Sequence, residues 1–206
     1  MIDPSKITDY NLTEPELQEM VLWWVCAAGK NGTTAARCHD TFLKYIGVNK
    51  LNPAFKVIQK LPKEKLPSIL KSCGIGCHSI KARTMWELAH SNLNLKKCEA
   101  VDLEKIYGIG MKTSRCFIIH TRKNARYAGL DTHMLKFLRK KGHDAPKATP
   151  TGKKYLELEK LVIEYADKAK KTPAEFDLDI WNKYKIKSTP GGAKNGSWDG
   201  ERTARS

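Results

Sequence analysis

The amino-acid sequence predicts an all-α protein, built from many helices of modest length joined by short turns. Apolar residues recur at helical spacing in one segment after another, and no segment alternates convincingly between apolar and polar residues as a half-buried strand does. Glycine, proline and N-cap residues divide these segments into helical lengths. With 206 residues, the chain can bury a substantial core, as one domain or as two small lobes that share a cleft.

The first helix is expected to begin after Thr13, an N-cap type of residue, with Pro15 in its first turn. This segment is apolar almost all round, which predicts a central position in the core. Gly29 and Gly32 interrupt the pattern, and a second helical pattern with one apolar side covers residues 33–47.

The rest of the chain shows further helical patterns. They cover residues 53–59 and 63–72, a longer helix after the turn at 74–76, a helical hairpin within 102–120, and helices over 131–141, 151–170 and 173–185. Apolar residues are scarce from Thr189 onward, so residues 188–206 are expected to form a disordered tail.

The charge of the chain favours a polyanionic partner. Lys and Arg number 37 against 22 Asp and Glu, a formal net charge of +15. Such side chains release counterions when they neutralise phosphates, which drives binding to nucleic acid. A membrane surface is the other option for a basic protein, but no stretch has the apolar length of a spanning helix and the N-terminus lacks a signal-peptide pattern. We therefore expect an intracellular protein, in the cytoplasm or nucleoid, or in the nucleus of a eukaryote.

The six cysteines are too few for a disulfide scaffold and suit a reducing compartment, where most would be small core residues. Cys73, Cys77 and His78 are potential metal ligands, but their spacing is not that of a zinc ribbon and no second Cys or His pair balances them. We expect neither a metal nor another cofactor.

The segment 103–114 carries the clearest functional pattern, in which the end of an apolar helix, a Gly-x-Gly turn and a new helix start follow one another. Glycine permits positive φ and close backbone approach, while the first amides of the new helix point outward as donors to an anion. Such a turn suits a DNA phosphate, although glycine can also serve only to end a helix. The DNA-binding candidates here are Gly108, Ile109, Gly110, Met111 and Thr113.

Asp131 stands directly before an apolar-periodic helix, in the position of an N-cap. Its carboxylate would accept helix amide hydrogen bonds and lie at the positive end of the helix dipole, and both effects favour the ionised form at neutral pH. The plain alternative is that Asp131 is only a cap.

Lys112 follows the glycine turn, and Asp131 comes nineteen residues later. This combination resembles the hairpin and catalytic Asp of the helix-hairpin-helix DNA glycosylases, which include endonuclease III. Residues 75–82 are similar to the Gly-aromatic-small-Lys-Ala segment of that family, and residues 21–36 to its first core helix and following loop. The resemblance covers residues 15–140 in the same order.

The resemblance implies a two-lobed, all-α helix-hairpin-helix glycosylase fold with the active-site cleft between the lobes. One lobe of six helices would cover residues 15–130, with the helix-hairpin-helix at about 100–120. Residues 1–14 and 131–187 would form the second helical lobe.

The resemblance also implies the chemistry. In this family the Lys attacks the sugar and the Asp lies close by, which implies catalytic roles for Lys112 and Asp131. A carboxylate stabilises positive charge on the sugar, and a neutral amine can capture C1′ as a Schiff base, which permits β-elimination of the 3′ phosphate. The protein would then be a bifunctional DNA glycosylase and AP lyase, a monomer acting on double-stranded DNA with a damaged or modified base. Lys112 would need burial to lower its pKa, an effect that Asp131 opposes.

Glycosylases flip the target base out of the stack and fill the gap with a side chain. The resemblance offers Asn31, in the loop after the first helix, and Cys77 or His78, after the turn at 74–76, as DNA-binding residues for that role. The plain alternatives are a polar loop for Asn31 and a buried small residue for Cys77.

Other aromatic and His side chains are interpreted more simply. Large aromatics at helical spacing are typical of core, although a Trp can stack on a base. The residues concerned are Trp23, Trp24, Trp86 and Trp181. We interpret His120 and His133 as solvated or capping residues rather than general bases.

Endonuclease III and its near relatives carry four clustered cysteines that hold an iron-sulfur cluster, whereas no Cys follows Cys116 here. The chain thus resembles cluster-free members such as the 8-oxoguanine glycosylases, which favours 8-oxoguanine as the excised base and leaves an oxidised pyrimidine open. The alternatives are a non-catalytic helix-hairpin-helix DNA-binding protein, a monofunctional glycosylase in which Lys112 only contacts a phosphate, and a base-modification enzyme of the same fold.

Overall fold

The computed structural model describes residues 1–185. This part of the chain consists of ten α-helices and two short 3-10 helices, and its only β-type pairing is an isolated bridge between Asn49 and Asn52. The all-α prediction is confirmed. No helix in this part of the chain is both long enough and apolar enough to cross a membrane.

The N-terminal half forms a group of helices around α1. The elements are η1 (Pro4–Lys6), α1 (Glu14–Ala27), α2 (Gly32–Tyr45), α3 (Ala54–Lys60), η2 (Lys63–Lys65), α4 (Leu66–Ser72) and α5 (His78–His90). Helix α1 is buried over most of its length and packs against α2, α3, α5 and α7. Its predicted central position is therefore confirmed.

The sequence signal at the start of α1 has a direct structural counterpart. The backbone N–H and the hydroxyl of Thr13 both donate to the Glu16 carboxylate, at 2.8 and 2.6 Å. These hydrogen bonds lower the pKa of Glu16. An N-cap arrangement of this kind contributes about 1 kcal/mol.

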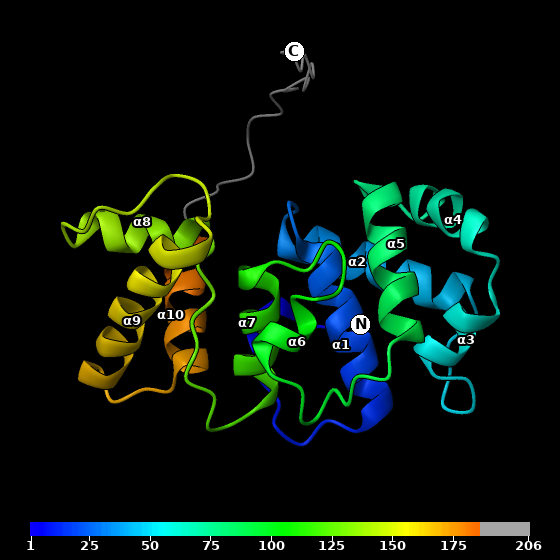
Figure 1. Ribbon diagram of the computed structural model, residues 1–206, viewed down its shortest axis with the longest axis horizontal. Coiled ribbons are helices and arrows are strands. Elements are labelled where there is room, and N and C mark those ends of the chain that lie inside the picture. Colours follow the sequence, from blue (N-terminus) through cyan, green and yellow to red (C-terminus); the bar gives the residue numbers. More distant parts are fainter. Residues whose placement is uncertain (186–206) are drawn as a thin grey trace, which may run out of the picture.

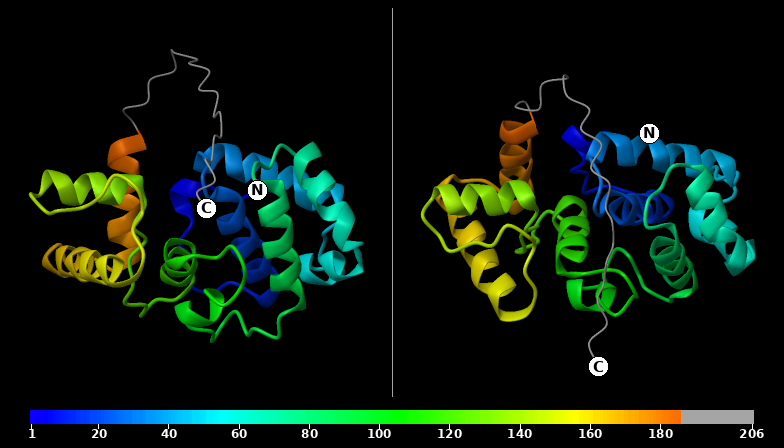
Figure 2. Two further views of the ribbon diagram at one scale, coloured as in Figure 1. Left: turned by 45° about the horizontal axis from the view of Figure 1, so that its top comes forward. Right: turned by 90° about the horizontal axis from the view of Figure 1, so that it is seen from above.

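The C-terminal half supplies the hairpin and the helices that follow it. They are α6 (Ala100–Leu103), α7 (Met111–Thr121), α8 (Thr132–Lys140), α9 (Gly152–Lys168) and α10 (Pro173–Lys185). In Figure 1, α8, α9 and α10 gather at one end of the molecule, α3, α4 and α5 lie at the other, and α1, α6 and α7 lie between them. The views in Figure 2 show the same arrangement from two further directions.

Two hydrophobic clusters underlie this arrangement. The larger extends from Ile7 to Ile118 along the chain, and the smaller from Ala128 to Ile180. The N-terminal segment contributes Ile7 to the larger cluster, while η1 contacts both α2 and α10. The division into lobes at residues 1–14, 15–130 and 131–187 stays a prediction, and the expected tail at 188–206 lies outside the described residues.

Buried polar groups join α7 to the C-terminal helices. Arg115 is buried and donates to the carboxylates of Glu104 and Glu159, at 2.9 Å in the second case. Glu159 also accepts the backbone N–H of Ala128 at 3.0 Å, and the Tyr155 hydroxyl donates to the Ala128 carbonyl at 2.8 Å. This network fixes the segment that leads from α7 to Asp131.

Candidate active site

The glycine turn before α7 is tightly constrained. Gly108 has φ +82°, and a Cβ at this position would collide with the Thr84 hydroxyl. Helix α5, which packs beside the turn, also holds it, because Glu87 accepts the Tyr107 backbone N–H at 2.9 Å. Glycine is therefore required at position 108 both by the backbone angle and by the close approach of α5.

Helix α7 begins at this turn without a side-chain cap. Its N-cap is Gly110, which is exposed and extended, and within residues 1–185 no side chain bonds the first amides there. These amides are therefore available to an external acceptor. Among the predicted DNA-binding residues, Gly108 is exposed and Met111 half-buried, whereas the Ile109 and Thr113 side chains are buried in the core. Contacts from these last two residues are thus limited to their backbone.

Lys112, in the first turn of α7, is half-buried, and its ammonium lies 4.8 Å from the ring centre of Trp24 on α1. Burial lowers the pKa of Lys112. Cys116 and the carboxylates of Asp131 and Asp177 raise it by more than burial lowers it, so the pKa of Lys112 lies above its usual value. The lowered pKa that attack on a sugar requires is therefore not a property of the resting site. Lys112 must lose a proton to a neighbour before it can act as a nucleophile.

Asp131 is the N-cap of α8, as predicted, and accepts the Met134 backbone N–H at 2.7 Å. Burial and the charge of Asp177 raise the pKa of Asp131 above its usual value, against the lowering effects of Lys112, the Met134 amide and His133. The sequence points to capping and the helix dipole, which favour the ionised form, but burial beside a second carboxylate outweighs them in the net direction of the pKa shift. The structure thus places Lys112 and Asp131 close enough to affect each other's pKa, and the surroundings of Asp131 make its carboxylate more basic than an ordinary Asp.

A third charged residue, Asp177 on α10, was not predicted. Its side chain is 16% exposed and lies 3.3 Å from His120 Nε2. His120 is completely buried, contacts the Thr8 hydroxyl through Nδ1 at 2.8 Å, and stacks on Trp24 at 5.5 Å. The interpretation of His120 as solvated or capping is wrong. No local pattern marks Asp177, because its partners come from α7 and the start of α8.

The three candidates for filling the gap in DNA lie on two adjacent turns. Asn31 is the exposed N-cap of α2 and accepts the Thr33 and Thr34 amides at 3.0 and 3.3 Å. Cys77 is exposed in a left-handed conformation with φ +52°, and His78 begins α5 half-buried. The alternative of a buried small residue is therefore wrong for Cys77. The fit of Asn31 and His78 to the role stays a prediction.

Lys81 joins these two turns. It is buried on α5 and donates to the carbonyls of Cys26 and Ala28 at the end of α1, both at 2.9 Å. Burial lowers the pKa of Lys81. Lys30 makes a second link by donating to the Gly74 carbonyl. The region predicted from the Lys-Ala segment is thus in contact with the loop that carries Asn31.

The remaining candidates divide between core and surface. Trp23 and Trp24 are buried, in agreement with the core interpretation. Cys73 is buried whereas Cys77 is exposed, and residues 1–185 contain no group of three Cys, His, Asp or Glu side chains that could hold a metal ion.

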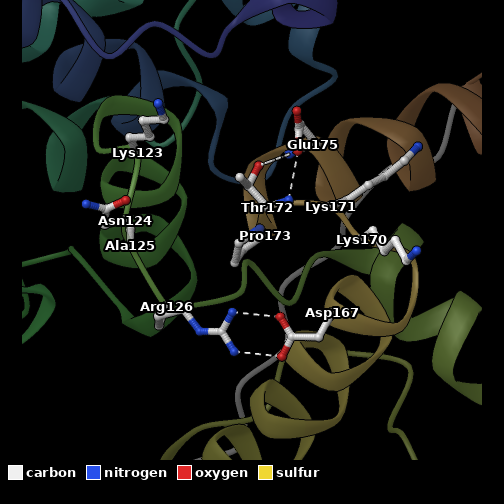
Figure 3. Close-up of a pocket in the computed structure, with 10 residues that line it drawn as sticks. All are labelled: Lys123, Asn124, Ala125, Arg126, Asp167, Lys170, Lys171, Thr172, Pro173 and Glu175. Atoms are coloured by element: carbon white, nitrogen blue, oxygen red, sulfur yellow. Dashed lines mark hydrogen bonds and ion pairs between the residues drawn. The ribbon is translucent and has the colours of Figure 1, made fainter.

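Two open hollows lie away from this cluster of charges. The larger, of about 430 Å³, lies between the chain after α7 and the connection from α9 to α10 (Figure 3). Across it Arg126 and Asp167 form a two-pronged ion pair at 2.7 Å, which is exposed to solvent and contributes little stability. Neither hollow is lined by Lys112 or Asp131. The candidate active site is therefore defined by convergent charges beside the hairpin.

Comparison with known proteins also points to the DNA glycosylases. A family model described as 8-oxoguanine DNA glycosylase (Ogg-HhH) matches residues 44–171. The Methanocaldococcus jannaschii 8-oxoguanine glycosylase/lyase, solved with a 15mer DNA containing 8-oxoguanine, superposes with a TM-score of 0.67 at 22% identity, over 87% of this chain and 85% of that one. A second structure of 8-oxoguanine DNA glycosylase from that organism gives 0.66 at 20% identity, over 88% and 84%.

The 8-oxoguanine DNA glycosylase of Thermotoga maritima is also similar, with a TM-score of 0.64 and 25% identity over 85% of this chain and 82% of that one. The predicted helix-hairpin-helix glycosylase fold and the predicted class of base-excising DNA repair enzyme are confirmed. Since the family model covers more than half of the sequence, the chain belongs to the helix-hairpin-helix family of 8-oxoguanine DNA glycosylases.

Proposed function

We propose that this protein, as a monomer, excises 8-oxoguanine from double-stranded DNA through a Schiff base on Lys112 and then nicks the strand by β-elimination. The observation that carries the proposal is the position of Lys112. It lies in the first turn of the hairpin helix, with its ammonium over Trp24 and in the field of Asp131 and Asp177. The choice of 8-oxoguanine as the substrate is supported by the similar structures, which are those of 8-oxoguanine glycosylases.

The hairpin would position the DNA. The free amides at the start of α7 suit a phosphate oxygen, and the net charge of +15 supplies the general attraction. A phosphate held at Gly110 would bring the adjacent sugar close to Lys112, two residues further on. Asn31, Cys77 and His78 would occupy the space that the flipped nucleotide leaves.

Asp131 would then accept one proton from the Lys112 ammonium. The raised pKa of Asp131 supports this transfer, since a more basic carboxylate removes the proton at a smaller cost. The neutral amine attacks C1′ while the bond from C1′ to the base nitrogen breaks and its electron pair leaves with the base. The nitrogen then loses its second proton, and its lone pair forms the C1′=N bond of the Schiff base as the C1′–O4′ bond breaks and O4′ takes up a proton. The C2′ proton and the 3′ phosphate are then eliminated from the Schiff base.

Borohydride trapping tests this proposal, because reduction fixes a Schiff base as a covalent adduct. Duplexes with 8-oxoguanine, an oxidised pyrimidine or an abasic site are compared, using wild type, Lys112→Gln and the matched control Lys71→Gln on the exposed side of α4. We expect an adduct on the 8-oxoguanine duplex for wild type and Lys71→Gln, and none for Lys112→Gln.

Other outcomes identify the alternatives. Release of free base without an adduct in wild type would indicate a monofunctional glycosylase. Tight, salt-dependent binding with neither base release nor nicking would indicate a DNA-binding module. A base that is altered and retained in the strand would indicate a base-modification enzyme.

A further inference from the structure

A line of polar groups, with the buried His120 at its centre and half-buried residues at its ends, connects the N-terminal segment to the candidate active site. The Thr8 hydroxyl contacts His120 Nδ1 at 2.8 Å, and His120 Nε2 contacts Asp177 at 3.3 Å. These contacts join residues 112 and 57 positions apart in the sequence. With the Thr8 hydroxyl donating to Nδ1, His120 donates its Nε2–H to the Asp177 carboxylate, so every member of the line has a partner.

The surroundings fix Asp177 beside the two residues predicted to be catalytic. A Cβ at Gly129, two residues before Asp131, would lie 3.6 Å from Asp177 Oδ1 and would collide with the Cys116 sulfur. The absence of a side chain at Gly129 thus allows α7, α10 and the start of α8 to converge. Trp24, on which His120 stacks, also lies beneath the Lys112 ammonium.

Counting charges shows what Asp177 adds. If the site held only Lys112 and Asp131, transfer of a proton from the ammonium to the carboxylate would leave both groups neutral. The sugar would then develop its positive charge with no carboxylate beside it. With Asp177 ionised, the same transfer leaves one negative charge in the site at that moment.

We propose that Asp177, held by His120 and Thr8, is a positioning residue that acts through Asp131 and Lys112. It makes Asp131 the acceptor of the Lys112 proton and keeps a negative charge near the sugar after that transfer. The inference rests on the proposed function. Its support is the contact geometry of Thr8, His120 and Asp177, together with the influence of Asp177 on the pKa values of both Lys112 and Asp131.

The test uses Asp177→Asn in the full chain, because Asn keeps the shape and can still accept from His120. The matched control is Asp179→Asn on the same helix, an exposed residue paired with Lys171. Single-turnover rates are measured for base excision on an 8-oxoguanine duplex and for strand nicking on a duplex with a preformed abasic site, with Kd and Tm for each variant.

We expect Asp177→Asn to slow base excision by about 10- to 100-fold, with Kd within about twofold of wild type. Nicking at the abasic site should fall less, because no glycosidic bond breaks there and no charged sugar forms. Asp179→Asn should behave as wild type. Thr8→Val, which removes only the hydroxyl, should slow excision by up to about fivefold and add nothing in the Asp177→Asn background.

Two results would overturn the inference while leaving the proposed function intact. One is Asp177→Asn with the excision rate of wild type while Lys112→Gln forms no adduct. The other is an equal loss of excision, nicking and Tm, which would assign Asp177 a purely structural role. If wild type itself forms no adduct and releases no base, the proposed function fails first, and this inference fails with it.

Discussion

Helix α7 supplies the cation of two charge clusters, each of which contains two carboxylates from other parts of the chain. The two clusters differ in how closely the cation contacts its carboxylates. Arg115 contacts Glu104 and Glu159 directly, within a network that also includes the Ala128 amide. Lys112, three residues earlier, lies near enough to Asp131 and Asp177 for their charges to raise its pKa, but no carboxylate of the described chain lies within 4.0 Å of its nitrogen.

The difference follows from the two cations. Arg115 cannot give up its proton in a protein, and its planar group satisfies two carboxylates at once, so this cluster is fixed. Lys112 can lose its proton, and the loose cluster around it lets the charge move. One turn of helix thus separates a cluster that stabilises the fold from one suited to chemistry.

The comparison is tested most strongly at Lys112. Lys112→Gln should reduce single-turnover excision by about 10³-fold or more, since no amine remains to form the Schiff base. Its free energy of unfolding should change by less than about 1.5 kcal/mol, because no close ion pair is lost. A quench assay for activity and urea unfolding for stability give the two numbers, and a large stability loss would contradict the assignment of Lys112 to the loose cluster.

The opposite result is expected at Arg115. Arg115→Ala leaves the buried carboxylate of Glu159 and the half-buried one of Glu104 without their cation, which should cost about 3–5 kcal/mol in urea unfolding. Arg126→Ala removes the exposed ion pair with Asp167 and serves as the control, with an expected loss below about 1 kcal/mol. Equal losses in the two variants would show that burial does not distinguish the pairs.

The glycine turn before α7, which we propose binds a DNA phosphate, can be weakened separately. Gly108→Ala places a methyl group against Thr84 at φ +82°, so we expect a loss of about 1–3 kcal/mol in unfolding free energy and weaker binding to DNA. Gly110→Ala has an extended backbone and open space around the added methyl group, and should leave the unfolding free energy within about 0.5 kcal/mol.

The smallest expected effect concerns pH. Because the pKa of Asp131 is raised in the folded state, the folded protein binds that proton more tightly than the unfolded chain, and stability falls as the pH rises through the folded pKa. Asp131→Asn keeps an N-cap and removes this cost, so at pH 7 it should be as stable as wild type or about 1 kcal/mol more stable. The difference should disappear at pH values below the ordinary range of an Asp carboxyl. A variant that is less stable than wild type at pH 7 would argue that the charge of Asp131 stabilises the fold.

Features that depend on neighbours in the sequence were predictable. Thr13 and Pro15 mark the start of α1, the glycines at 108 and 110 mark the turn before α7, and Asp131 caps α8 as expected. In each case the signal lies within a few residues of the structure it produces, so that local physical chemistry is sufficient.

Features that depend on distant partners were not predictable. The burial of His120, the presence of Asp177 and the direction of the pKa shift at Asp131 all arise where α7, α8 and α10 meet. A single Asp in an amphipathic helix such as α10 has the same appearance whether it faces solvent or a buried His. Only the packing of the helices decides between the two.

The bonds of Lys81 have a mechanical consequence for the opposite side of the site. Its ammonium holds the carbonyls of Cys26 and Ala28, while its own helix carries Cys77 at the N-terminus. These hydrogen bonds therefore hold the loop with Asn31 and the turn with Cys77 together as one unit. If a mutation or bending of bound DNA displaces one of these two segments, we expect the other to move with it.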